Sequence, residues 1–210
     1  MKPASGDTSG RVPRPAFLRL ARQLTLGGAL AAAPAVAGPS HGEMLGTGCT
    51  GCHGPDGVST GNGIPSIAGL DKFYLARAMV QFKNAERPST IMGRIAKGYT
   101  DTELRQMAKY FGDLAWSGWQ GTPDAAALDE ARRIHDEVCA ECHEQEGRHQ
   151  DREMPRIAGQ CPDYLFLALL QYRDPQDKEK PPQPDKMLQA LQPLSDEQLL
   201  ALSRYYATQK

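Results

Sequence analysis

The same five-residue motif occurs twice in this chain. Cys49-Thr-Gly-Cys52-His53 recurs as Cys139-Ala-Glu-Cys142-His143, at an offset of 90 residues. The offset continues past the cysteines, because Ile-Pro-Ser-Ile-Ala-Gly at 64–69 aligns with Met-Pro-Arg-Ile-Ala-Gly at 154–159. Two matching segments of this kind predict a duplicated fold.

Further along, the offset becomes 95, because the second half carries five extra residues. The equivalent positions there are Met92 and Met187, Leu104 and Leu199, and Tyr110-Phe111 and Tyr205-Tyr206. The proline- and charge-rich segment 174–185 can hold the insertion, and the segment 117–123 has the turn-forming composition of a linker. We therefore expect one domain at 38–118, a linker at 119–123 and a second domain at 124–210.

Both halves show helical periodicity. Apolar residues with a spacing of three and four predict a middle helix in each half, on Tyr74, Leu75, Ala78, Met79 and Phe82, and on Tyr164, Leu165, Ala168, Leu169 and Tyr172. Capping boxes at 100–103 and 195–198 predict final helices at 101–112 and 196–208, and a shorter helix should precede each cysteine motif, most clearly within 124–138. No alternating strand pattern competes, so the fold class is all-α. Domains of about 80 residues usually need a disulfide, a metal or another staple.

The first 37 residues differ from the rest. Four arginines, the last of them Arg22, lead into an uncharged apolar run that ends at Ala35-Val36-Ala37. This pattern is typical of a secretory signal peptide cleaved after Ala37, which predicts a periplasmic protein. The apolar run is shorter than the roughly 20 residues that span a bilayer, and no later segment is long enough. We expect no membrane span in the mature protein.

The charge balance argues against a nucleic-acid partner. The chain has 24 basic and 25 acidic residues, and residues 1–37 contain five of the basic residues but only one of the acidic ones. The mature protein is therefore acidic, whereas proteins that bind nucleic acid carry basic patches.

The repeated motif indicates covalent haem attachment. In C-x-x-C-H, the two thiols form thioethers with the haem vinyl groups, and the same helical turn brings the histidine to the iron. Two such motifs at equivalent places predict two haem c groups. We expect Cys49, Cys52, Cys139 and Cys142 to anchor them, with His53 and His143 as proximal iron ligands.

Three other uses of paired cysteines are weaker. Zinc knuckles are usually spaced by roughly 15–20 residues, whereas 86 residues separate these two pairs. A thioredoxin-type pair belongs beside a βαβ pattern, which is absent from the sequence. Structural disulfides fit an oxidising compartment but do not explain a histidine after both motifs.

The second axial ligand is expected to be a methionine. Met92 lies in the predicted loop 88–93, and Met187 is its repeat partner. The other methionines are weaker candidates, because Met79 and Met107 lie on apolar stripes, Met44 precedes the motif and Met154 aligns with Ile64. Among the histidines, His149 is too near His143 to reach the opposite face of the haem easily. His41 and His135 do not recur in the other half and are interpreted as surface or helix residues. Met92 and Met187 are thus the predicted distal ligands.

Two prolines and one cysteine complete the set of candidates. Pro65 and Pro155 are expected to offer backbone carbonyls to the proximal histidines, although each could instead form a simple turn. Cys161 has no repeat partner, because Asp71 stands at the equivalent position. We expect a free thiol packed beside Pro162, with intermolecular pairing as the alternative.

The sequence resembles the dihaem class I cytochromes c, which include the cytochrome c4 family and the cytochrome subunit of flavocytochrome c sulfide dehydrogenase. The run Ser89-Thr-Ile-Met-Gly-Arg-Ile-Ala-Lys-Gly-Tyr99 is very similar to the first haem-ligand loop of that subunit, and Cys52-His-Gly54 and Ile157-Ala-Gly-Gln160 fit as well. The resemblance implies two tandem class I cytochrome c domains, each wrapped around one covalent haem.

The resemblance also implies a role. Such a subunit performs no catalysis by itself, and forms a heterodimer with an FAD-containing flavoprotein that oxidises sulfide. It passes the electrons through its haems to an external acceptor such as a small cytochrome, and the closer match of the first domain favours that domain as the one facing the flavin. The alternative is a free-standing cytochrome c4-like carrier to a terminal oxidase, which the segment 187–195 also fits. A zinc or disulfide scaffold is a third reading.

Overall fold

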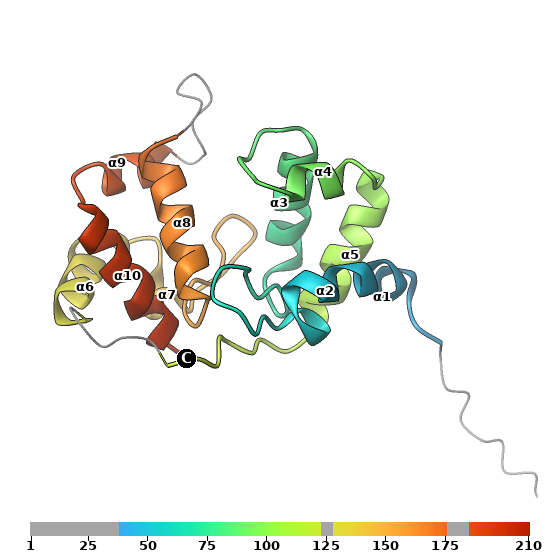
Figure 1. Ribbon diagram of the computed structural model, residues 1–210, viewed down its shortest axis with the longest axis horizontal. Helices are drawn as coiled ribbons and strands as arrows, with labels where there is room; N and C mark the ends of the chain where they lie inside the picture. Colours follow the sequence, from blue (N-terminus) through green and yellow to red (C-terminus); the bar gives the residue numbers. More distant parts are fainter. Residues whose placement is uncertain (1–37, 123–127, 176–184) are drawn as a thin grey trace, which may run out of the picture. The chain divides into compact units, whose positions relative to one another are not determined.

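The computed structural model describes residues 38–122, 128–175 and 185–210, and this part of the chain contains helices and no strand (Figure 1). The region Gly38–Lys210 forms one compact unit. Its α-helices are α1 His41–Gly46, α2 Thr50–His53, α3 Lys72–Lys83, α4 Met92–Ala96, α5 Asp101–Asp113, α6 Leu128–Ile134, α7 Glu144–Gly147, α8 Pro162–Arg173, α9 Asp185–Leu191 and α10 Asp196–Thr208. The all-α prediction is confirmed.

In the first half, α5 packs against α1 and α3. The capping box that predicted α5 is present: the Thr100 hydroxyl accepts from the Glu103 backbone N–H at 3.3 Å, and the Glu103 carboxylate accepts from the Thr100 N–H at 2.8 Å. The helix buries its apolar face in a core cluster made of Leu70, Leu75, Ala108 and Phe111.

In the second half, α10 packs against α6 and α8. Its capping box is also present, with the Gln198 N–H donating to the Ser195 hydroxyl at 3.3 Å and the Ser195 N–H donating to Gln198 Oε1 at 3.0 Å. The core cluster here is larger, and consists of Ala131, Ile134, Leu165, Leu191, Leu199, Ala201, Leu202, Tyr205 and Tyr206.

The duplication extends to single backbone hydrogen bonds. The carbonyl of Gly57 accepts from the amides of residues 67 and 68, and that of Gly147 accepts from residues 157 and 158. The amides of Gly69 and Gly159 donate to Phe111 and Tyr206, each at 2.8 Å. All four glycines have positive φ, between 70° and 84°. The two halves therefore share one scaffold, as the aligned sequence segments predict.

Two glutamine side chains from the second half bind the backbone of the first. Gln160 accepts from the Ser66 N–H at 2.8 Å and donates to the Ser66 carbonyl at 2.9 Å. Gln150 binds two different residues of the first half, accepting from the Asp71 N–H at 3.0 Å and donating to the Gly69 carbonyl at 2.9 Å. Each amide satisfies one donor and one acceptor of the facing half, which fixes the two halves against each other.

The predicted linker contains a buried anchor. Trp119 is 8% exposed; its backbone N–H donates to Gly159, and its indole N–H donates to Asn62. Cys161 packs beside Trp119, fully buried and unpaired, as expected for a free thiol. The predicted signal peptide and the first residues of the predicted helix 124–138 lie outside the described residues. Among the helices that are described, none is long and apolar enough to cross a membrane.

Candidate haem-binding sites

The first C-x-x-C-H motif lies on a short helical segment. Cys49 ends a 3-10 turn, and α2 carries Cys52 and His53 on the next turn. Both thiols are free of disulfides. Burial, with a smaller contribution from Cys52, raises the pKa of the Cys49 thiol. The local sequence therefore places two thiols and an imidazole on two consecutive helical turns, as thioether attachment and iron ligation require.

His53 has one nitrogen committed and one free. Its Nδ1 lies 2.8 Å from the carbonyl oxygen of Pro65, and because a carbonyl only accepts, Nδ1 carries the proton. The imidazole is 8% exposed; burial lowers its pKa, and the Pro65 bond opposes this shift. The result is a neutral ring whose Nε2 lone pair is available to a metal. The expectation for Pro65 is confirmed.

The second motif starts from a different turn. A π-helix at His135–Cys139 precedes it, and the His143 N–H donates to the Cys139 carbonyl at 2.8 Å. Burial raises the pKa of the Cys139 thiol, and a hydrogen bond to Tyr206 opposes that shift. His143 is 9% exposed. Burial, together with the nearby His135 and His149, lowers the pKa of His143 to about 4. This imidazole is also neutral near pH 7.

The two histidines differ at Nδ1. His143 Nδ1 is buried and has no hydrogen-bond partner among the described residues. The expectation that Pro155 supplies its carbonyl is therefore wrong in this structure. The Pro155 loop is attached to Gly147 in the same way as the Pro65 loop is attached to Gly57. The missing hydrogen bond therefore reflects the placement of His143 and not that of the Pro155 loop.

The predicted methionine ligands lie on short helices. Met92 is the first residue of α4, so the expected loop 88–93 ends in a helical turn, and Met92 is half-buried. Met187 lies within α9, where it packs half-buried against the core of the second half. Met107 is buried, as expected of a core methionine, and Met44 is largely exposed. The assignment of Met92 and Met187 to iron stays a prediction.

His135 does not lie at the surface. It is 2% exposed, its Nδ1 lies 2.9 Å from the Tyr206 hydroxyl, and its ring also packs near Tyr205. Two features of the sequence could have indicated that His135 is buried: its position beside the apolar stripe residues Ala131 and Ile134, and the tyrosine, Tyr206, where the first half has Phe111. His41 is exposed, as expected, and His149 lies 3.7 Å from the Asp151 carboxylate.

Both halves have a donor set that fits a c-type haem. Each provides two unpaired thiols and an adjacent buried neutral imidazole. In the first half, the proton position also leaves Nε2 free for iron. The residues present therefore fit the group that the motif predicts.

Comparison with known proteins identifies the family. Cytochrome c4 of Thiocapsa roseopersicina is 30% identical over 184 residues, which cover 83% of this chain and 94% of that protein. The chain belongs to the cytochrome c4 family. The crystal structure of reduced cytochrome c4 from Pseudomonas stutzeri superimposes with a TM-score of 0.71 at 23% identity, covering 83% of this chain and all of that one. The fold is thus the two-domain class I cytochrome c fold.

Two other relatives of this c4-like chain have named electron-transfer roles. The cytochrome subunit of sulfide dehydrogenase from Chlorobaculum tepidum is 51% identical over 76 residues, which are 36% of this chain and 68% of that one. The thiosulfate dehydrogenase electron acceptor of Stutzerimonas stutzeri is 28% identical, covering 76% of this chain and 77% of that protein. No protein-family model matches the chain. As a cytochrome c4 homologue, the protein is a dihaem electron-transfer protein with two covalently bound haem c groups.

Proposed function

We propose that each C-x-x-C-H motif holds one haem and that the matching methionine of each half completes the iron coordination. A haem held by these residues would supply one-electron chemistry between ferric and ferrous iron. The chain keeps both histidines neutral by burial and excludes water from them. The assigned residues are Cys49, Cys52, His53 and Met92 for the first haem, and Cys139, Cys142, His143 and Met187 for the second.

The protein acts as the cytochrome subunit of a sulfide-oxidising dehydrogenase. It accepts electrons from an FAD-containing flavoprotein, with which it forms a heterodimer, and passes them to an external acceptor such as a small cytochrome. The observation that carries this assignment is the 51% identity to the Chlorobaculum subunit, joined to the donor set on α2. The chain by itself performs no bond-making chemistry.

The proposed organisation follows the repeat. Residues 1–37 are a signal peptide that directs the chain to the periplasm, and the two cytochrome domains are 38–118 and 124–210, joined by 119–123. Two separate core clusters, one drawn from residues 70–111 and one from 131–206, support this division.

The flavoprotein is proposed to contact the first domain, near α4. Ile91 and Ile95 flank Met92 and are 51% and 38% exposed. Exposed apolar side chains beside a predicted haem ligand suit a protein partner, because burying them is favourable and would place the partner next to that ligand. Aspartate at both positions should weaken flavoprotein binding at least tenfold. Leu167→Asp is the matched control, because Leu167 is 53% exposed in the second half.

The test is affinity purification of the tagged mature protein from its native periplasm, followed by a visible spectrum. The expected result is two c-type haems per chain together with a flavin and a stoichiometric larger subunit. A dihaem protein recovered alone, from cells in which the flavoprotein is present, would contradict the subunit assignment.

A free-standing carrier to a terminal oxidase is the second candidate. The observation that favours it is coverage, since the Thiocapsa cytochrome c4 aligns with 83% of this chain and the sulfide dehydrogenase subunit with 36%. If the isolated protein shuttles electrons between partners and forms no lasting complex, this candidate replaces the first. Thiosulfate-oxidising and sulfide-oxidising extracts, assayed side by side for reduction of the haems, separate the possible donors.

A further inference from the structure

Charge is unequally divided between the two halves. Residues 38–118 contain eight basic and seven acidic residues, whereas residues 119–210 contain eleven basic and seventeen acidic residues. Part of the acidic excess surrounds the second C-x-x-C-H motif, where four side chains are acidic and exposed: Asp136, Glu137, Glu141 and Glu144. None of the four forms an ion pair with another described residue. The equivalent positions of the first half are uncharged: Gly46, Thr47, Gly51 and Gly54.

Packing does not impose this difference at two of the positions around the motif. A Cβ at Gly48 or at Gly51 would meet no atom within 4 Å, and neither glycine has a positive φ. The first half would therefore accept a valine and a glutamate there, as the second half has at Val138 and Glu141. The carboxylates of the second half are a feature of its surface and not a requirement of the shared scaffold.

The turn that follows the histidine also differs between the halves. Gly54 adopts φ 81° and ψ 168°, and a Cβ there would lie 1.9 Å from the backbone oxygen of Val58, which excludes glutamate. In the second half, the chain turns at the next two residues, Gln145 and Glu146, with left-handed φ of 54° and 55°. The second half can therefore carry an exposed carboxylate, Glu144, directly after its histidine.

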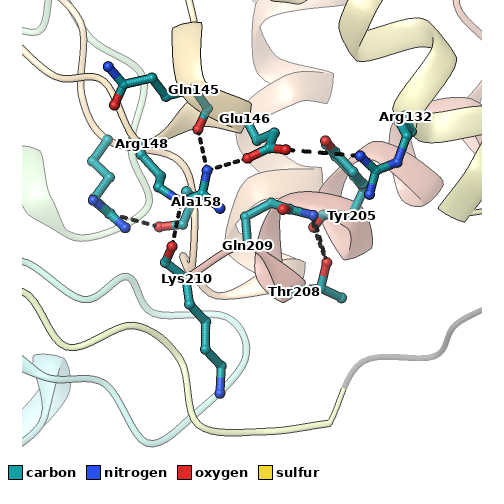
Figure 2. Close-up of polar contacts among 10 residues, drawn as sticks. Arg132, Gln145, Glu146, Arg148, Ala158, Tyr205, Thr208, Gln209 and Lys210 are labelled. Carbon is teal, nitrogen blue, oxygen red and sulfur yellow. Dashed lines mark hydrogen bonds and ion pairs between the residues drawn. The ribbon is translucent and has the colours of Figure 1, made fainter.

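Arginine side chains support this alternative turn and pair one further carboxylate (Figure 2). Arg148 donates to the Gln145 carbonyl at 2.9 Å and also binds the Glu146 carboxylate. Arg132 lies 3.9 Å from the other oxygen of that carboxylate. Glu146 is thus paired inside the protein, whereas the four carboxylates around the motif remain available to a partner.

An apolar side chain lies among these carboxylates. Val138 is 39% exposed and directly precedes Cys139, a predicted haem anchor that is itself half-buried. Residues three or four apart on helical backbone are neighbours, which places Glu141 beside both Val138 and Glu137. The acidic face, defined as Val138 with Asp136, Glu137, Glu141 and Glu144, therefore has an apolar centre and a charged rim, as protein interfaces have.

We propose that the acidic face of the second half is the docking surface for the external electron acceptor, and that this acceptor presents lysine or arginine side chains around an apolar contact. The inference rests on the proposed role in electron transfer and names the half from which electrons leave. Unpaired carboxylates attract a basic protein within about a Debye length, roughly 10 Å at 0.1 M salt, and speed the encounter. Contact with Val138 then holds the acceptor beside Cys139.

Electron transfer to a basic probe tests the role of charge. The haem-loaded mature protein is reduced and then mixed in a stopped-flow instrument with a lysine-rich ferric cytochrome c. One electron leaves the protein and reduces one ferric acceptor, so no other reactant is needed. The second-order rate should fall by roughly tenfold or more between low and high salt. The same probe with acetylated lysines should react slowly at both salt concentrations, because acetylation removes the positive charges.

Charge reversal tests the location. Glu137→Lys with Glu141→Lys should lower the rate at low salt by roughly tenfold or more. The matched control is Glu153→Lys with Glu197→Lys, which makes the same change in net charge at two exposed positions of the second half outside 136–144. The control should change the rate by less than about twofold, because screening weakens distant charges. Equal slowing by the two variants, or no slowing by the first, would overturn the proposal.

Carbodiimide cross-linking locates the contact without relying on electron transfer. The reagent joins carboxylates to lysines that touch them, so cross-linked peptides should contain Glu137 or Glu141. Cross-links found only elsewhere would contradict the docking surface, as would charge reversals that weaken the flavoprotein complex and leave the acceptor unaffected. Haem content is measured beforehand, since a chain without two haems would contradict the proposed function itself.

Discussion

The first and second halves share a scaffold but differ around the proximal histidine. Equivalent glycines make equivalent backbone bonds, and equivalent leucines, Leu104 and Leu199, are both fully buried. Yet His53 Nδ1 is hydrogen-bonded to the Pro65 carbonyl, whereas His143 Nδ1 has no partner among the described residues, and the second half also has a buried His135–Tyr206 pair. The two halves share the contacts that hold the helices but differ around the predicted iron ligand, so the two haem sites have different environments on one fold.

The halves also differ in the size of the hydrophobic core that their own side chains form. Among the described residues, the cluster of the first half has four buried members and that of the second has nine. A small core needs a staple to be stable. The folding of the first half should therefore depend on its haem more strongly than the folding of the second half does. This is the largest difference that we expect between the halves.

The largest effect is expected from removing the haem anchors one half at a time. Cys49→Ser with Cys52→Ser should halve the haem content and unfold most of the first half, because its core cluster has only four buried members. Cys139→Ser with Cys142→Ser should also halve the haem content, but retain more of its own helix. Circular dichroism and haem content measure both, and equal helix loss in the two variants would contradict the difference in core size.

Truncating the equivalent leucines is expected to have the next largest effect. Leu104→Ala and Leu199→Ala each remove a fully buried side chain and should each lower the free energy of unfolding by about 2–5 kcal/mol. Denaturant unfolding followed by haem absorbance shows whether the halves respond together or separately. Leu200→Ala, at a half-buried position next to Leu199, should cost much less.

Loss of the Gln160 amide tests how firmly the halves are joined. Gln160→Leu removes both hydrogen bonds that Gln160 makes to the buried Ser66 backbone, and the one it accepts from the Cys161 N–H, and the loss of a partner by a buried polar group costs about 1–3 kcal/mol. We expect unfolding to become less cooperative as well as weaker. The exposed Gln120, changed to leucine, is the control. If Gln160→Leu behaves like this control, the amide does not join the halves.

Tyr206→Phe makes the second half resemble the first. The change leaves His135 Nδ1 without its hydroxyl partner at 2.9 Å and should lower the free energy of unfolding by about 1–2 kcal/mol. Phe111→Tyr is the reciprocal change, and it puts a hydroxyl into the apolar cluster of the first half. Stabilisation by Tyr206→Phe in denaturant titrations would show that the polar pair contributes nothing to stability.

The smallest effect concerns pH and again separates the halves. Burial lowers the pKa of His135 below its ordinary value of 6.5, with Arg132 acting in the same direction and Asp136 and Glu146 opposing it. The unfolded chain therefore binds this proton more readily, so the free energy of unfolding should decrease as the pH falls below 6.5. His135→Gln should flatten that slope, and the exposed His41→Gln should not. Unfolding curves between pH 7 and pH 5 decide this.

Local patterns in the sequence determined a large part of this protein. The 90-residue repeat, the two C-x-x-C-H motifs, the capping boxes at Thr100 and Ser195 and the carbonyl of Pro65 were all predicted and are present in the structure. These features depend on residues close in the chain or on a motif that recurs, so spacing and residue type suffice to find them.

Tertiary structure decided the rest. The burial of His135, the Gln160 and Gln150 bonds between halves, and the missing partner of His143 involve groups that lie far apart in the sequence or depend on a single backbone turn. A substitution such as glycine to glutamate after the histidine is visible in the aligned repeats. Its consequence depends on the Val58 carbonyl that blocks a Cβ and on the arginines that support the alternative turn. The sequence predicted an iron ligand in each half, and packing set the hydrogen bonding that makes the two predicted ligands, His53 and His143, different.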